Sequence, residues 1–293
     1  CGGLTIAQDP KDAEYGDMPR AAIDTDAVDL VLTAADIGTR LIALAAYPRP
    51  ARLPVPDVPD RAVEERESPE RAYQDILVAL RIRMRHDFRH YKRATVLRRL
   101  ERRVQVHGLR DLSAYRDYLR DHPDEMPLLL ADMLISVTSF FRDQQAFEAL
   151  DKSIVPDIMN RVAPGDEARI WIPACASGEE SYSIAILLRE HMETLDHPPQ
   201  VQIFATDLDA RALGLARAGR YAASIESHIR ADRLERWFVR EGDTYCVSKE
   251  LREMCIFSPH SVIKDAPFSR IDILSCRNLL IYFDRDVQMR VLQ

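Results

Sequence analysis

The sequence predicts an α/β protein, with a Rossmann-like domain built on a parallel sheet and an all-helical domain before it. From Ala168 onward, strand-like runs alternate with amphipathic helical runs, as in the strand-helix-strand crossovers of a parallel sheet. Between about Arg71 and Leu150 there are helical patterns without strand-like alternation. The 293 residues, 46% of them hydrophobic, leave room for about two domains and a buried core.

The N-terminal 47 residues form a segment of their own and end in an apolar pattern that suits a helix ending near Tyr47. Six prolines and many charges follow between Pro48 and Pro69, a composition that stays extended, so we expect a linker over residues 48–70. The chain begins with Cys-Gly-Gly and has three expected core strands, too few for a finished sheet. We therefore expect it to be a piece of a longer protein.

Four helical patterns predict the helical domain over residues 71–145. They are ERAYQDILVALRIRM, KRATVLRRLERRVQVHG with Gly108 as a stop signal, LSAYRDYLRDHP and PLLLADMLISV. The second helix has an apolar stripe and an outer face that carries Arg98, Arg99, Arg102 and Arg103. Between Arg81 and Arg103 there are ten Lys or Arg and two acids, although the whole chain has a net charge of −7.

The α/β domain is expected over residues 146–293. ARIWIPAC and QVQIFATDLD are the first two predicted strands, and the helices EESYSIAILLREHME and ARALGLARAG follow them in turn. A less regular stretch with the hairpin-like RWFVREGDTYCVS precedes RIDILSCRNLLIYF, the third predicted core strand with its loop and helix. These elements place any ligand at the carboxyl ends of the strands.

The first strand-to-helix turn, ACASGEE, has one glycine and two adjacent acids. Sites for NAD, FAD or ATP need several glycines whose backbone N–H groups contact phosphate, and two carboxylates beside a pyrophosphate would cost several kcal/mol. A nicotinamide dehydrogenase is therefore the least favoured function. Glu180 has a structural interpretation, because S-G-E-E fits a capping box in which Ser177 caps the helix. Glu179 is left to face a ligand with positive charge.

Asp207 ends the next strand, where an acid commonly takes ribose hydroxyls; Asp209 could do the same, and either could instead cap a helix. A nucleoside with a ribose, no phosphate and a cationic group fits Glu179 and Asp207 together. S-adenosylmethionine has these features, and the residues alone thus favour a methyltransferase.

Four motifs, SVTSFFRD, PACASGEESYSIA, FATDLD and DILSCRNLLIYF, come in this order behind YKRATVLRRLERR. Over residues 71 to 293 the chain resembles the chemotaxis receptor methyltransferase family, CheR, which methylates glutamates of chemoreceptors with S-adenosylmethionine and releases S-adenosylhomocysteine. The resemblance implies a small antiparallel β-subdomain at about residues 219–256. Residues 1–47 are similar to the end of the receptor methylesterase CheB, with Asp9 at the position of its triad aspartate, so the parent looks like a CheB/CheR fusion without esterase activity in this piece.

The resemblance also implies site residues. Cofactor contacts are expected from Ser136, Thr138, Arg142, Glu179, Asp207, Ser261, Val262, Arg277 and Asn278. Arg142, Arg277, Asn278 and Tyr282 are expected near the transferred methyl group. A glutamate carboxylate is already ionised at neutral pH, so the reaction needs alignment rather than a general base. A non-catalytic sensor or scaffold that binds S-adenosylmethionine is the alternative function.

The basic helix has three interpretations: a solvated face, a nucleic-acid site or a docking face for acidic receptor helices. The chain is net acidic and has few aromatic residues there, which disfavours nucleic acid, and the resemblance favours the receptor. No apolar run reaches the roughly 18 residues of a membrane span. The five cysteines show no C-x-x-C pair or zinc spacing, so we expect no metal, buried thiols and a cytoplasmic protein.

Overall fold

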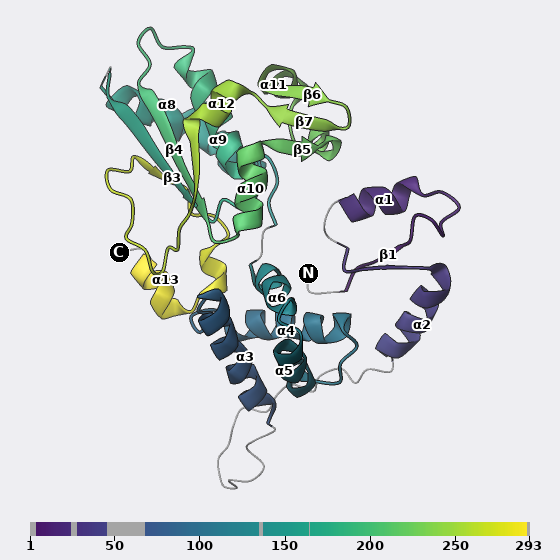
Figure 1. Ribbon diagram of the computed structural model, residues 1–293. Helices are drawn as coiled ribbons and strands as arrows, with labels where there is room; N and C mark the ends of the chain where they lie inside the picture. The colour runs from purple at the N-terminus through teal and green to yellow at the C-terminus, as the bar shows by residue number, and fades with distance from the viewer. Residues whose placement is uncertain (1–3, 25–27, 46–67, 135–136, 164, 292–293) are drawn as a thin grey trace. The chain divides into compact units, whose positions relative to one another are not determined.

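A computed structural model describes residues 4–24, 28–45, 68–134, 137–163 and 165–291, so most of the expected linker and the predicted helix end at Tyr47 lie outside the described residues. The chain divides into two compact units, Cys1–Met133 and Leu134–Gln293. Figure 1 labels their elements. Among the described residues, no helix has the length and apolar character needed to cross a membrane.

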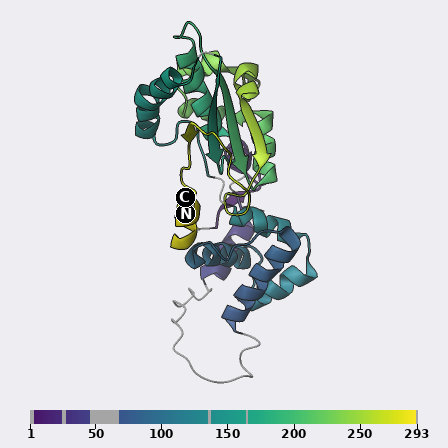
Figure 2. The same cartoon turned by 90° about the vertical axis from the view of Figure 1, so that its left-hand side faces the viewer.

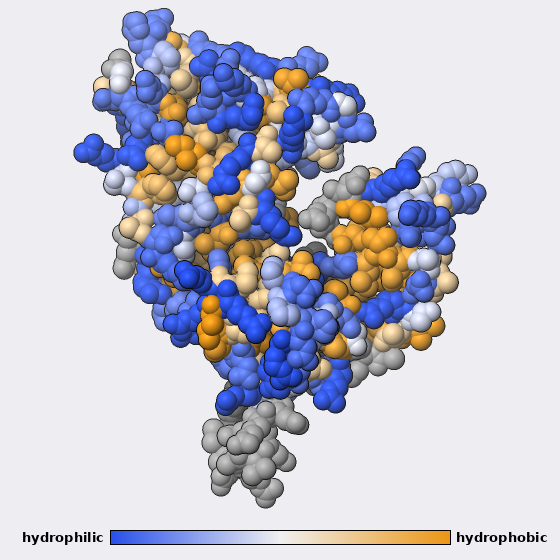
Figure 3. Space-filling model, viewed as in Figure 1, coloured by the Kyte–Doolittle hydropathy of each residue, from blue (hydrophilic) through white to orange (hydrophobic). Residues whose placement is uncertain are grey.

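The N-terminal segment pairs two short parallel strands, β1 (Ile6–Gln8) and β2 (Leu30–Leu32), with Ile6 opposite Leu30. Helix α1 (Asp17–Asp24) follows β1, and α2 (Ala34–Ala45) follows β2. None of the described residues of α2 is buried, and Ile42 is 74% exposed. Figure 3 shows hydrophobic surface gathered on this segment. The segment therefore has almost no core of its own.

Four helices form the rest of the first unit, as the sequence predicts: α3 (Pro69–Met84), α4 (Arg93–Val106), α5 (Leu112–Asp121) and α6 (Glu125–Met133). Ser68 caps α3 by accepting the Arg71 N–H, and Asp111 caps α5 by accepting the Ala114 N–H at 2.9 Å. The helices bury one apolar face each, which includes Ile76, Leu80, Val96, Leu100, Leu119, Met126 and Leu129.

Two of the four arginines expected on the outer face of α4 are held inside the first unit. Arg103, 12% exposed, donates to both carboxylate oxygens of the buried Glu125, at 2.7 and 2.6 Å. Tyr115 also donates to Glu125, and these bonds hold the pKa of that carboxyl below its usual value although burial acts to raise it. Arg102 pairs with Asp29. Arg98 is exposed and Arg99 is partly buried, so the outer face is narrower than the sequence pattern indicates.

The second unit contains a parallel sheet with the strand order β8-β4-β3-β9. Its strands are β3 (Glu167–Pro173), β4 (Gln200–Asp207), β8 (Cys255–Pro259) and β9 (Ile273–Leu274), and Figures 1 and 2 show the longer ones running side by side. The expectation of three core strands was wrong, because β8 pairs in parallel with β4 from Cys255 to Pro259. This strand is short and lacks an alternating pattern, so the sequence signal was weak.

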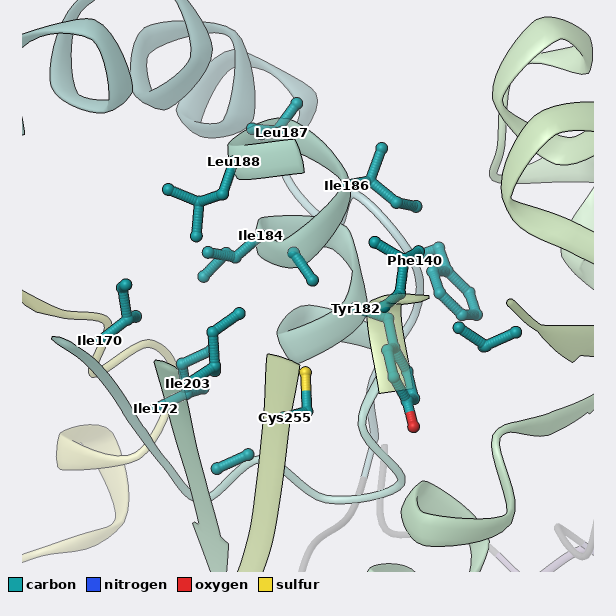
Figure 4. Close-up of a cluster of buried hydrophobic side chains, with 14 of the residues drawn as sticks. Phe140, Ile170, Ile172, Tyr182, Ile184, Ile186, Leu187, Leu188, Ile203 and Cys255 are labelled. Atoms are coloured by element: carbon teal, nitrogen blue, oxygen red, sulfur yellow. The ribbon is translucent and has the colours of Figure 1, made fainter. Parts of the chain in front are cut away.

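Helix α9 (Glu179–Met192) crosses from β3 to β4 and is buried along most of its length. Figure 4 shows Ile170, Ile172 and Ile203 of the strands facing Ile184 and Leu188 of this helix. All five side chains are at most 1% exposed. Because burying a side chain of this size stabilises a fold by about 1.5 to 3 kcal/mol, this packing fixes where α9 begins at the end of β3.

A second, antiparallel sheet with the order β5-β7-β6 confirms the predicted hairpin. It consists of β5 (Arg220–Ala222), β6 (Phe238–Glu241) and β7 (Thr244–Val247), which Figure 1 shows as a group apart from the parallel sheet. The other elements of the unit are α7 (Gln144–Ala149), a π-helical turn (Leu150–Ile154), α8 (Val155–Arg161), α10 (Ala210–Ala218), η3 (Ala223–Ser227), α11 (Ala231–Trp237), α12 (Lys249–Met254), η4 (Leu280–Tyr282) and α13 (Arg285–Val291).

Candidate active site

The carboxyl ends of the four parallel strands bring distant parts of the sequence together. The turn after β3 is tied to the end of β4, because the Cys175 N–H donates to the carbonyl of Thr206 at 3.0 Å. The end of β4 is tied to the end of β8 by the His260 N–H, which donates to the carbonyl of Asp207. The segment after β9 joins them through Ser275. One edge of the sheet thus gathers most of the side chains that the sequence singles out.

The turn between β3 and α9 has an unusual backbone. Ala174, Ala176 and Gly178 have φ angles of 56°, 48° and 95°, in the left-handed region that disfavours residues with a Cβ. A Cβ on Gly178 would lie 2.9 Å from the Cβ of Ala216, so the one glycine of this turn is required there. Residues held in such conformations cluster at functional sites, where the surrounding contacts enforce them.

Asp207 is held at the end of β4 by backbone donors. One carboxylate oxygen accepts the Ala176 N–H at 2.8 Å, and the other accepts the Asp209 N–H at 2.9 Å. Burial raises the pKa of Asp207, although the backbone donors act to lower it. Asp209 instead caps α10 by accepting the N–H groups of Arg211 and Ala212. Of the two acids left open by the sequence, Asp209 thus has the helix-capping role, and Asp207 remains the candidate for the ribose hydroxyls.

Glu179 begins α9, and its carboxylate accepts the Ser177 hydroxyl with both oxygens, at 3.0 and 2.8 Å. Burial raises the pKa of Glu179. Among the described residues, no Lys or Arg forms an ion pair with it. A desolvated carboxylate without a cation is costly and favours a cationic ligand.

Glu180 does not form the capping box that the sequence favoured, so that interpretation was wrong. Gly178 occupies the N-cap position of α9, which places Ser177 one residue too early to cap. The Glu180 carboxylate accepts the Ser275 hydroxyl at 2.7 Å and lies 3.7 Å from a guanidinium nitrogen of Arg277. Burial raises its pKa, while Ser275 and Arg277 lower it. Glu180 therefore supports the segment after β9.

Arg277 is fixed from several sides. Its Nη2 donates to the carbonyl of Arg142 at 2.5 Å and to the Asp143 carboxylate at 2.7 Å. Its guanidinium lies over the ring of Phe147, 5.0 Å from the centroid. Phe141 and Asp143 have positive φ angles of 50° and 63°, so the backbone that meets Arg277 is also strained. The segment before α7 and the segment after β9 consequently form one polar cluster with Glu180.

The structure places the remaining sequence-predicted residues as follows. Ser261 is buried after β8, where its hydroxyl accepts the Lys264 N–H, and Val262 follows it. Arg142 donates to the carbonyl of Val137 at 2.7 Å. Thr138 is partly buried, Asn278 is exposed with a φ of 56°, and Tyr282 is partly buried in η4. Ser136 lies outside the described residues.

Sequence reasoning missed four residues that contact the site: Asp143, Glu180 as a partner of Arg277, Ser275 and Tyr221. Tyr221 of β5 donates from its hydroxyl to the carbonyl of Ser177 at 2.7 Å. Asp143 lies in the motif SVTSFFRD and Ser275 in the motif DILSCRNLLIYF, so these two motifs could have pointed to both residues. Nothing in the local pattern around Tyr221 points to the turn.

Among the described residues, no group of three or more His, Cys, Asp or Glu could hold a metal.

Comparison with protein families decides what this site belongs to. The profile described as "CheR methyltransferase, SAM binding domain" matches residues 136–293. The chain belongs to the CheR methyltransferase family. The all-alpha domain of CheR matches residues 71–134, and the CheB methylesterase profile matches residues 1–41. The resemblances stated from the motifs are thereby confirmed, and so is the predicted fold class.

Several relatives resemble the chain over different lengths. An uncharacterized 104.1 kDa protein of Rhodobacter capsulatus is 36% identical over all of this chain, which spans 32% of that protein's length. The "Putative methyltransferase Cher3" of Pseudomonas putida is 32% identical over 74% of the chain and 80% of the relative. "Chemotaxis protein methyltransferase 2" of Vibrio cholerae is 31% identical over 69% and 72%.

Proposed function

We propose that this CheR-family chain is a protein-glutamate O-methyltransferase that uses S-adenosylmethionine to methylate glutamates of chemoreceptors. The observation that carries the proposal is the pair of partly buried carboxylates, Glu179 and Asp207, at adjacent strand ends. Two neighbouring residues of one turn hold them: the Ala176 N–H donates a hydrogen bond to Asp207, and the Ser177 hydroxyl donates one to Glu179. The negative charge of the two carboxylates would attract a cationic nucleoside and repel a phosphorylated one.

The donor set fits S-adenosylmethionine residue by residue. Asp207 has acceptor capacity beyond its bonds to backbone N–H groups, as needed for ribose hydroxyls. Glu179 would take the ammonium of the methionine part. Thr138, Arg142, Ser261 and Val262 are proposed as further contacts, as is Ser136 from the family resemblance. Asn278 and Arg277 would complete the site beside the methyl group.

When bound, S-adenosylmethionine supplies a methyl group on a positively charged sulfur, and the products are a methyl ester and S-adenosylhomocysteine. The residues of the chain have to align an ionised carboxylate with that methyl group, a contribution that can reach about 7 to 11 kcal/mol. No proton has to be removed from the carboxylate. Arg277 is proposed to orient the incoming anion, with Arg142, Asn278 and Tyr282 beside it.

The test is a filter assay for transfer of a labelled methyl group from S-adenosylmethionine to a cytoplasmic chemoreceptor fragment. We expect base-labile label on the receptor, as for an ester, and none on a receptor whose candidate glutamates are changed to alanine. Saturable binding of S-adenosylmethionine without transfer to any receptor fragment would instead support a non-catalytic sensor or scaffold. Absence of both would refute the proposal.

We further propose that Arg98 contributes to receptor docking. It is the exposed member of the four arginines, whereas Arg103 and Arg102 pair with acids of the same unit. Arg98→Glu should raise the receptor concentration for half-maximal methylation by about 3- to 10-fold, because a rim charge of the wrong sign opposes an acidic partner. Arg110→Glu, at an arginine that lies outside α4 and is 82% exposed, is the matched control. Equal loss in both variants, or a loss of cofactor affinity, would argue against docking.

Cofactor binding should depend on pH through Glu179. Burial raises the pKa of this carboxyl above its ordinary 4.5, and its ionised form is the one that attracts an ammonium. Affinity for S-adenosylhomocysteine should therefore be full above the raised pKa and fall by up to about tenfold per pH unit below it. Burial raises the pKa of Asp207 as well, and that carboxylate would contact the ribose of any nucleoside.

Methylthioadenosine lacks the ammonium, so the difference between the two ligands isolates Glu179. Calorimetric titrations of both ligands across the acidic range measure it, and Glu179→Gln should remove the difference. Parallel pH profiles for the two ligands in the unaltered chain would contradict the assignment.

A further inference from the structure

Tyr221 links the antiparallel sheet to the acidic turn. It lies in β5, is 8% exposed, and its hydroxyl donates to the carbonyl of Ser177 at 2.7 Å. The hydroxyl also lies 3.2 Å from where a Cβ on Gly178 would be, so it sits directly against the turn. Tyr221 pairs with Tyr245 of β7 in the sheet, which makes its backbone position part of that sheet.

Ser177 connects Tyr221 to Glu179 by hydrogen bonds. Its carbonyl accepts from Tyr221, and its hydroxyl donates to both oxygens of the Glu179 carboxylate. The residues on either side, Ala176 and Gly178, have φ angles of 48° and 95°. A backbone in this region persists when outside contacts enforce it, and the Tyr221 hydroxyl is such a contact.

Aromatic packing holds Tyr221 in place. Its ring meets the ring of Phe140 edge to face, with centroids 4.9 Å apart, and Phe140 meets Phe238 of β6 in the same way at 5.4 Å. Figure 4 shows Phe140 beside Tyr182 of α9. Such pairs contribute about 0.5 to 1.5 kcal/mol beyond the buried area. The ring of Tyr221 therefore has little freedom to move away from the turn.

We propose that Tyr221 is a positioning residue that orients Glu179 through Ser177 and so sets the affinity for the amino-acid end of the cofactor. The proposal rests on the proposed function, because it takes Glu179 to face the ammonium of S-adenosylmethionine. Its consequence is that the antiparallel sheet, although it supplies no carboxylate to the site, determines how tightly the cofactor is held at one end.

The test compares two ligands on the purified chain by calorimetry. Tyr221→Phe removes one buried hydrogen bond and keeps the ring, so affinity for S-adenosylhomocysteine should fall by about 5- to 10-fold. Affinity for methylthioadenosine, which lacks the amino acid, should change less than about twofold. Ser177→Ala should show the same selectivity, and adding Tyr221→Phe to it should cause little further loss, since the two act in series.

Tyr182→Phe is the matched control. Tyr182 is also buried, and its hydroxyl donates at the same 2.7 Å to a backbone carbonyl, but that carbonyl belongs to Ala216 of α10. This variant should lose stability without discriminating between the ligands.

A loss of equal size for both ligands in Tyr221→Phe would overturn the proposal and leave the tyrosine a structural role, as would an unchanged affinity for S-adenosylhomocysteine. If Tyr221→Phe fails to fold, Ser177→Ala still tests the proposal, because an absence of ligand selectivity in that variant would refute the route from Tyr221 to Glu179. If the unaltered chain binds methylthioadenosine as tightly as S-adenosylhomocysteine, the assignment of Glu179 fails first. If it binds neither, the proposed function itself fails.

Discussion

Replacement of Asp207 by alanine is expected to abolish measurable binding of S-adenosylhomocysteine, with a loss of at least about 100-fold. Hydrogen bonds to a charged acceptor contribute about 1.5 to 3 kcal/mol each, and this carboxylate is proposed to take both ribose hydroxyls. The change also frees the Ala176 N–H, which the carboxylate holds at 2.8 Å in a strained turn. Isothermal titration calorimetry measures the affinity, and thermal unfolding shows whether the fold is retained.

Asp209→Asn is the matched control, because asparagine caps helices nearly as well as aspartate and should keep the bonds to Arg211 and Ala212. Affinity in this variant should stay within about twofold. The opposite pattern, with Asp209→Asn losing binding and Asp207→Ala keeping it, would make Asp209 the ribose acid.

Arg277→Gln should reduce the rate of methyl transfer by about 100- to 1000-fold, the usual cost of removing one fixed donor from an active site. Affinity for S-adenosylhomocysteine should fall less, by about tenfold at most, since the main effect is on the incoming carboxylate. Arg277 is held in place by Asp143 at 2.7 Å and lies near Glu180, and from this position it is proposed to meet the carboxylate of the substrate. Single-turnover methylation of a receptor fragment measures the rate.

Arg290→Gln, at an exposed arginine of α13, controls for the loss of a positive charge nearby in the sequence. Arg277→Lys should recover part of the rate, because lysine keeps the positive charge. The recovery should be incomplete, because an ammonium cannot form the bidentate hydrogen bonds of a guanidinium. A rate in Arg277→Gln within a few fold of the unaltered chain would remove this residue from the mechanism.

Local sequence patterns predicted most elements of the second unit, and the reasons are visible in β3, α9 and β4. Each is long and rich in apolar residues between clear turn or helix-start signals, so its own residues suffice to identify it. Strand β8 was not predicted as a core strand. It has only five residues and starts directly after α12 ends at Met254, so it is too short to show a periodic pattern of its own. Its place beside β4 depends on pairing with residues about fifty positions away.

The arginines of α4 show a different limit. The helical period correctly separates its apolar stripe from its charged side, but it cannot tell a solvated arginine from one that meets an acid of another helix. Arg103 meets Glu125 because α6 packs beside α4, and that packing is a property of the whole unit. Glu125 itself gave no sign in the sequence that it would be buried.

The sequence by itself determined the fold class, the longer helices and strands, the acidic turn that disfavours a phosphorylated ligand, and the family. These depend on local periodicity and on residue types at a fixed spacing. Only the tertiary structure separated the acids: Asp209 caps α10 and Glu180 supports Arg277, which leaves Glu179 and Asp207 as the acids proposed to contact a ligand. The physical reason is that these tasks are set by partners far away in the chain, such as Ser275, which lies 95 residues from Glu180, and Tyr221, which lies 44 residues from Ser177.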